Sequence, residues 1–151
     1  SDPALYGKVI VTELAPPAKV DIAPPGSADM VLSFRNFHNW HMNGVEKDVL
    51  KAVYTALKPG GIFGVTDHRS ESSTGKDGYI NPAVLIAAAK EAGFILVEQS
   101  EINANPKDTH THEKGVWTLP PTLAGKVADH DKMRAIGESD RLTMKFMKPA
   151  E

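Results

Sequence analysis

The sequence predicts an α/β fold with a mostly parallel sheet, flanking helices and an antiparallel pair of strands at one edge. Short apolar runs of strand length alternate with segments of helical period, and the last two runs have no clear helix between them. Such alternation implies parallel strands with helices packed on them, whereas strands without a crossover helix pair antiparallel. The chain has 151 residues, so we expect residues 1–151 to form a single domain.

The first part of the chain contains two predicted strands and a helix. Residues 8–14 (KVIVTEL) are rich in β-branched side chains and precede a proline pair, which favours a strand. Residues 28–34 (ADMVLSF) form a continuous apolar run, as in strands covered on both faces. Between Gly44 and Lys58, apolar side chains recur at helical spacing with charged side chains opposite, and the sequence KPGG then ends the helix.

The second part contains three more predicted strands and a second helix. The strands are residues 62–68 (IFGVTDH), 94–100 (FILVEQS) and 140–148 (DRLTMKFMK). Asn81 is a typical N-cap and Pro82 a typical first-turn residue, so a helix begins there, and Gly93 ends it. Residues 101–125 show no period, and long loops of this kind are often functional.

Composition excludes several classes of function. The formal net charge is −2 and no basic run is present, so we expect no nucleic acid partner and no anionic membrane surface. The absence of cysteine removes disulfides, thiolate catalysis and cysteine-bound zinc together. No apolar run approaches the ~20 residues that cross a bilayer. We therefore expect a soluble protein, of the cytoplasm or the periplasm, that acts on a small molecule.

Polar and aromatic side chains gather directly after two of the predicted strands. Ligands of open α/β sheets bind beyond the carboxyl ends of the strands, so these side chains converge if the strands are neighbours. The candidate catalytic residues are Asn36, His38, Asp67 and His68, and the candidate substrate-binding residues are Arg35, Asn39, Trp40, His41 and Arg69. Imidazoles at this position can act as acid, base or metal ligand.

Several of these residues also have a purely structural interpretation. Trp40 is expected to pack under the following helix rather than to bind substrate. Asp67 would brace Arg35 or Arg69 in an ion pair, His38 would fill space, and the asparagines would cap a loop.

A second candidate site lies in the long loop. His110 and His112 are separated by one residue, and in an extended segment both imidazoles lie on one side, which suits a metal. Because no third ligand is identified, we favour a solvated loop over a metal site for this pair. If the loop folds over the crevice, the pair would meet His38, His41 or His68, and a bound divalent metal would activate water for hydrolysis.

Five segments carry a family resemblance over nearly the whole chain. They are ADMVLSFRNFHNW, VLKAVYTALKPGGIFGVTDHR, INPAVLIAAAKEAGFILVEQS, VWTLPP and GESDRLTMKFMKP. The chain resembles the later portion of class I S-adenosylmethionine-dependent methyltransferases, and most closely a bacterial group of predicted methyltransferases. The resemblance implies a Rossmann-like methyltransferase fold, S-adenosylmethionine as cofactor and methyl transfer to a small molecule.

The chain also departs from that family. Class I methyltransferases begin with a strand and a glycine-rich turn that cradles the cofactor, and no such turn follows any predicted strand here. We therefore expect a truncated methyltransferase fold that starts after the cofactor loop. In the family's fold, the two missing strands lie beside the strand formed here by residues 28–34. Their absence would expose the flank of that strand, which either residues 8–14 or a second copy of the chain would cover. A homodimer is the expected assembly.

Three functions stay open at this point. The first is a methyltransferase-like protein that needs a partner chain or an unusual cofactor pose. The second is a small hydrolase, with or without a metal, that reuses the crevice. The third is a non-catalytic dimeric binding module.

Overall fold

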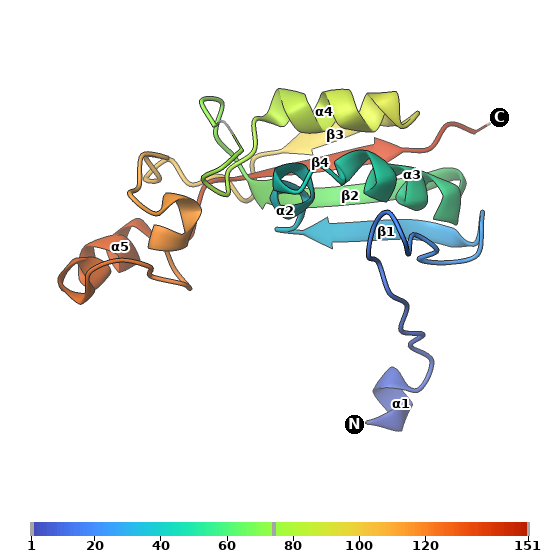
Figure 1. Cartoon of the computed structure of the whole chain (residues 1–151), viewed down its shortest axis with the longest axis horizontal. Helices are drawn as coiled ribbons and strands as arrows, with labels where there is room; N and C mark the ends of the chain where they lie inside the picture. The colour runs from blue at the N-terminus through green and yellow to red at the C-terminus, as the bar shows by residue number, and fades with distance from the viewer. Residues whose placement is uncertain (1, 74, 151) are drawn as a thin grey trace.

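A computed structural model describes residues 2–73 and 75–150 as a four-stranded sheet with the strand order β1-β2-β4-β3 (Figure 1). β1 (Ala28–Phe34) pairs in parallel with β2 (Leu57–His68). β4 (Arg141–Met147) lies between β2 and β3 (Ile95–Ser100) and is antiparallel to both. The predicted α/β fold and the antiparallel edge pair are confirmed. The sheet is mixed, because three strands run in one direction and β4 opposes them.

Helices pack on one face of this sheet. α3 (Glu46–Ala56) and α4 (Pro82–Glu91) bury their apolar sides against the strands, and the short α2 (Phe37–Met42) lies beside α3. The core is the layer between helices and strands. Its largest fully buried apolar side chains include Phe37, Leu50, Leu57, Phe63, Leu85 and Phe146. Burial of this apolar surface is the main force that holds the helices on the sheet.

The opposite face of β1 is apolar and open to solvent. Met30, Leu32 and Phe34 alternate with the inward Val31 and Ser33, and they are 55%, 54% and 64% exposed. β1 is also an edge strand among the described residues, so the backbone groups of its outer side have no strand partner.

The predicted strand at residues 8–14 is wrong. This segment forms no strand and does not pair with β1, and Val9, Ile10 and Val11 are 63%, 85% and 89% exposed. Figure 1 shows it running away from the sheet toward α1 (Pro3–Tyr6). A β-branched composition favours extended backbone, but a strand also requires a partner, and the chain places none beside this segment.

The predicted strands at residues 28–34, 62–68, 94–100 and 140–148 are confirmed, as are both predicted helices. β2 begins already at Leu57, so the KPGG segment that was expected to end the first helix lies within the strand. The Asn81 side chain accepts the Ala83 N–H at 2.9 Å, and Pro82 occupies the first turn of α4. Gly93 follows with a φ of +102°, a conformation that glycine adopts without strain.

Several short helices were not predicted. They are α2, the 3₁₀ helices η1 (Gly115–Thr118) and η2 (Val127–Asp129), and α5 (His130–Ile136). Each has seven residues or fewer, too short to show a helical period. None of the helices in residues 2–73 and 75–150 has the length and hydrophobicity that a membrane-spanning helix needs.

Candidate functional site

The candidate site lies where β1 and β2 end side by side. Phe34 is in register with Thr66, and the Arg35 N–H donates to the Thr66 carbonyl at 2.7 Å. The residues after β1 therefore meet the last residues of β2, Asp67 and His68. The chain turns out of β1 at Arg35, whose φ of +54° lies in the left-handed region that non-glycine residues rarely adopt.

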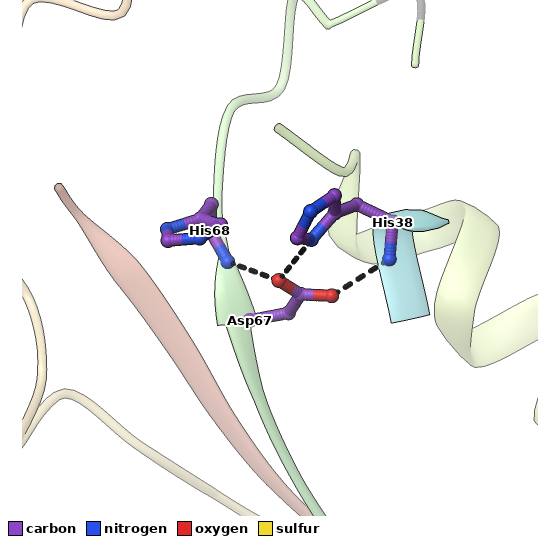
Figure 2. Close-up of side chains that lie close together, drawn as sticks. All are labelled: His38, Asp67 and His68. Carbon is purple, nitrogen blue, oxygen red and sulfur yellow. Dashed lines mark hydrogen bonds and ion pairs between the residues drawn. The ribbon is translucent and has the colours of Figure 1, made fainter. Parts of the chain in front are cut away.

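Asp67 and His38 form a buried pair at this junction (Figure 2). Asp67 is fully buried, and its Oδ1 lies 2.8 Å from His38 Nδ1 and accepts the His68 backbone N–H at 2.8 Å. Its Oδ2 accepts the His38 backbone N–H, also at 2.8 Å. Because a carboxylate only accepts hydrogen bonds, Nδ1 of His38 is the donor to Asp67, so Nε2 is the nitrogen that carries the lone pair in the neutral ring. None of the residues that the structure describes forms a hydrogen bond with Nε2 of His38.

His68 lies beside this pair as a neutral imidazole. Its ring is 5.1 Å from the His38 ring, and its Nδ1 lies 2.5 Å from the Ser139 hydroxyl. Burial lowers the pKa of His68 to about 4, although the nearby Asp67 opposes the shift. His68 is therefore uncharged at neutral pH and can hydrogen-bond a ligand without adding charge.

A pocket of about 250 Å³ opens over these side chains. One wall comes from the strand ends and α2: Phe34, Arg35, His38, Asn39 and His68. The other wall comes from the long loop: Val116, Trp117, Pro120, Pro121 and Thr122. The loop residues were not predicted as site residues, although VWTLPP was one of the segments that carried the family resemblance.

A buried polar network holds this loop in place. Asp108 accepts the Tyr79 hydroxyl at 2.9 Å and the backbone N–H of Asp140 at 2.8 Å. It also accepts the His110 N–H at 3.0 Å and lies 2.8 Å from His112 Nε2. Burial favours the neutral acid, but these hydrogen bonds outweigh it and lower the pKa of Asp108. The carboxylate thus connects the loop to the sheet end.

The predicted metal pair is engaged by two different carboxylates. His112 contacts Asp108, and His110 Nε2 lies 3.3 Å from Asp140. Among the described residues, the one group of three whose ligand atoms all lie within 4.8 Å is His38, Asp67 and His68. This group offers nitrogen and oxygen donors for a divalent ion. Both Asp67 oxygens already accept protein hydrogen bonds, so the arrangement as it stands suits proton transfer.

Several other predicted site residues lie outside the pocket. Arg69 binds Glu101 and Asp140, which raise the pKa of its guanidinium, and it does not pair with Asp67. His41 Nδ1 lies 3.2 Å from Glu46 Oε1. Trp40 packs edge-on against Phe37, its ring 6.3 Å away.

The two predicted asparagines are joined by a hydrogen bond of 3.0 Å from Asn39 Nδ2 to Asn36 Oδ1. Asn39 lines the pocket. Asn36 lines a separate groove of about 320 Å³ along the free edge of β1.

The described residues do not fit the cradle that S-adenosylmethionine requires. In the part of the chain that the structure covers, β1 is followed by Arg35 and Asn36, β2 by Arg69 and Ser70, and β3 by Glu101. None of these strands leads into a glycine turn that would let backbone approach a cofactor.

The sequence matches no family model and no curated protein. Solved structures match the fold. The [4+2]-cyclase SpnF is 16% identical with a TM-score of 0.56, over 85% of this chain and 52% of that chain. The Burkholderia thailandensis 1,6-didemethyltoxoflavin-N1-methyltransferase, with bound S-adenosylhomocysteine, is 13% identical with a TM-score of 0.53, over 86% and 48%. A Methanosarcina mazei S-adenosylmethionine-dependent methyltransferase is 9% identical with a TM-score of 0.54, over 85% and 62%.

These similarities define the class of fold. The chain has the α/β fold of class I S-adenosylmethionine-dependent methyltransferases, and it spans about half the length of the first structures it matches. Identities this low show the fold alone, and one of the similar proteins is named as a cyclase. The fold therefore does not define the reaction, which depends on the residues of the site.

Proposed function

We propose that this chain is methyltransferase-like and binds a small organic acceptor in the pocket at the ends of β1 and β2, where His38 removes a proton from it. The observation that carries this proposal is the buried contact between Asp67 and His38, a residue that lines the pocket, because this contact engages Nδ1 and leaves Nε2 without a hydrogen-bond partner among the described residues. A general base needs this arrangement, with its basic atom accessible and its other nitrogen held.

Asp67 would strengthen His38 in two ways. It fixes the ring orientation through one hydrogen bond to Nδ1 and a second to the backbone N–H of the same residue. It also stabilises the imidazolium that forms when Nε2 accepts a proton, because a buried negative charge lies 2.8 Å from the ring. General base catalysis of this kind contributes about 10²–10⁴-fold in rate.

Methyl transfer is the reaction class that the fold supports. Removing a proton from a hydroxyl or an N–H group exposes the lone pair that a methyl acceptor must offer. In this proposal, the described residues bind and deprotonate the molecule that accepts the methyl group. S-adenosylmethionine would require a cradle formed by protein surface other than these residues.

We propose a homodimer as the assembly. β1 is an edge strand among the described residues, its open face carries the exposed Met30 and Leu32, and it contains no proline that would block pairing. A second copy of β1 is the self-complementary partner for such an edge, because twofold symmetry lets two edges pair antiparallel.

A coloured phenol tests the proposed base directly. 2-Nitrophenol changes its absorbance when it ionises, so its apparent pKa can be read when it is bound to the purified protein. We expect the wild-type protein to lower the apparent pKa of the bound phenol. His38→Gln should bind the phenol with unchanged absorbance. Equal ionisation with both proteins would overturn the proposed function.

The same experiment separates the proposed function from a metal-dependent hydrolase and from a binding module. A metal-dependent hydrolase would lose its effect on the bound phenol when a chelator is added and regain it with zinc, because the ion would sit on His38 and His68. A binding module would hold the phenol without ionising it. We expect neither behaviour.

A further inference from the structure

We propose that the pocket beside His38 takes a small planar aromatic acid, whose carboxylate is bound by Arg35 and whose ring hydroxyl is deprotonated by His38. This inference rests on the proposed function and names the substrate class for it. In the proton transfer, the O–H bond breaks, the proton passes to Nε2 of His38, and the electron pair stays on the phenolic oxygen. The product is a phenolate beside an imidazolium that Asp67 stabilises.

The charge of the pocket lining favours an anion. Arg35 is the one permanently charged residue that lines the pocket, and no carboxylate lines it. Asp67 is fully buried behind His38, and its oxygens are occupied by hydrogen bonds. The two imidazoles that line the pocket, His38 and His68, carry no negative charge in either protonation state. An anionic group that enters the pocket therefore meets one cation and no opposing charge.

Arg35 has no competing partner in the described chain. The other arginines that the structure describes, Arg69, Arg134 and Arg141, each form an ion pair with an acidic side chain, whereas the Arg35 guanidinium forms none. Its backbone adopts the strained φ of +54° directly at the pocket mouth. Strained residues of this kind concentrate at ligand sites, where their position matters more than their conformational cost. A planar guanidinium binds a carboxylate through two parallel hydrogen bonds.

The remaining walls suit the faces of a ring. Trp117 stands 6.3 Å from the His38 ring at 69°, and it is 36% exposed. Phe34 lines the opposite side from the end of β1, and Pro120 and Pro121 add rigid apolar surface. Aromatic side chains bind flat ligands by stacking or edge-on contact. A pocket lined by these groups takes a planar ligand in preference to a flexible polar one.

The volume of the pocket sets an upper limit on the size of the ligand. Drug-sized ligands occupy pockets of about 300–1,000 Å³, and this pocket measures about 250 Å³. One aromatic ring with short substituents fits, whereas a nucleotide does not. Arg35 directly follows β1, and His38 lies three residues later in the first turn of α2. They would therefore contact two different groups of one small ligand.

A matched pair of coloured phenols tests this substrate class. 4-Hydroxy-3-nitrobenzoate and 2-nitrophenol differ only by the carboxylate, and both report ionisation by absorbance. We expect the wild-type protein to bind the acid up to about fivefold more tightly, because Arg35 is exposed and an ion pair in water contributes about this factor. Arg35→Gln should lose that preference and bind the two phenols about equally. Arg35→Lys should restore part of the preference.

Arg134→Gln is the matched control, because it removes the same charge from α5, outside the pocket. It should keep the preference for the acid. Thermal unfolding of each variant checks that Arg35→Gln is folded, and Arg35→Lys provides the test if it is not. Equal binding of the two phenols by the wild-type protein, or equal weakening of both by Arg35→Gln, would overturn this inference. If the wild-type protein preferred the acid but did not ionise either phenol, the proposed role of His38 as base would be overturned and the substrate class would stand.

Discussion

The carboxylate of Asp67 lies 2.8 Å from Nδ1 of His38, although 29 residues separate the two along the chain. This contact exists because β1 and β2 are parallel neighbours that end at the same edge of the sheet. It defines which nitrogen of His38 is free, and the proposed chemistry depends on it.

Replacing Asp67 by asparagine should disrupt this relationship. The amide is neutral and presents one acceptor oxygen, so it cannot accept all three hydrogen bonds that the carboxylate accepts. We expect Asp67→Asn to lower stability by about 2 kcal/mol and to abolish the ionisation of bound 2-nitrophenol. Nitrogen-15 NMR of His38 should change from one tautomer to a mixture. The control Asp131→Asn, on the exposed side of α5, should leave both the ionisation of the phenol and the His38 spectrum unchanged. An unaltered His38 spectrum in Asp67→Asn would contradict the proposed contact between Asp67 and Nδ1.

His68 makes stability depend on pH. Burial lowers its pKa from 6.5 to about 4, so as the pH falls the unfolded chain takes up the proton before the folded protein does. Stability from this residue is therefore full above pH 6.5 and is lost as the pH falls toward 4. The total loss should reach roughly 3 kcal/mol. Urea unfolding at several pH values should show this slope in the wild-type protein and a shallower one in His68→Asn. Equal slopes would rule out a buried neutral imidazole.

Asp108 should matter for stability and for the shape of the pocket. Removing its carboxylate leaves the Tyr79 hydroxyl and the Asp140 N–H buried without an acceptor. We expect Asp108→Ala to cost about 3 kcal/mol and to increase hydrogen exchange in residues 108–121. Because Trp117 would lose its position, binding of both nitrophenols should weaken together. Glu113→Ala, an exposed change in the same loop, is the control. If the amides of Asp108→Ala were protected from exchange as well as those of the wild-type protein, the network would not be what holds the loop.

S-adenosylmethionine should not stabilise this chain by itself. A ligand present at 100 times its dissociation constant stabilises a protein by about 2.7 kcal/mol. Since no strand in the described chain leads into a glycine turn, we expect no shift in unfolding temperature at millimolar cofactor. A saturable shift would show that the present residues bind the cofactor in another way.

The free edge of β1 should drive self-association. Analytical ultracentrifugation of the wild-type protein should show a dimer. Leu32→Lys should yield a monomer, because a charge on the edge opposes pairing. Lys132→Leu, on α5, is the matched control and should leave the dimer unchanged. A wild-type monomer at high micromolar concentration would exclude the proposed assembly.

Local patterns in the sequence were sufficient to predict most of the strands and the two longer helices. The apolar run at residues 28–34 predicted β1, and the cap formed by Asn81 and Pro82 predicted the start of α4, because both signals act within a few residues. The same reasoning failed at residues 8–14, where β-branched composition was present and a pairing partner was absent. It also missed α2, which is shorter than the window in which a helical period can be recognised.

By itself, the sequence determined that polar and aromatic residues follow two strands, and that His38, Asp67 and His68 were candidates for chemistry. Only the tertiary structure decided their partners. It paired Asp67 with His38 rather than with Arg35 or Arg69, and it placed His110 and His112 on separate carboxylates. It also brought Trp117 from the long loop to the pocket. The physical reason is that a hydrogen bond depends on distance and direction in space, and strand pairing brings together residues that the sequence keeps far apart.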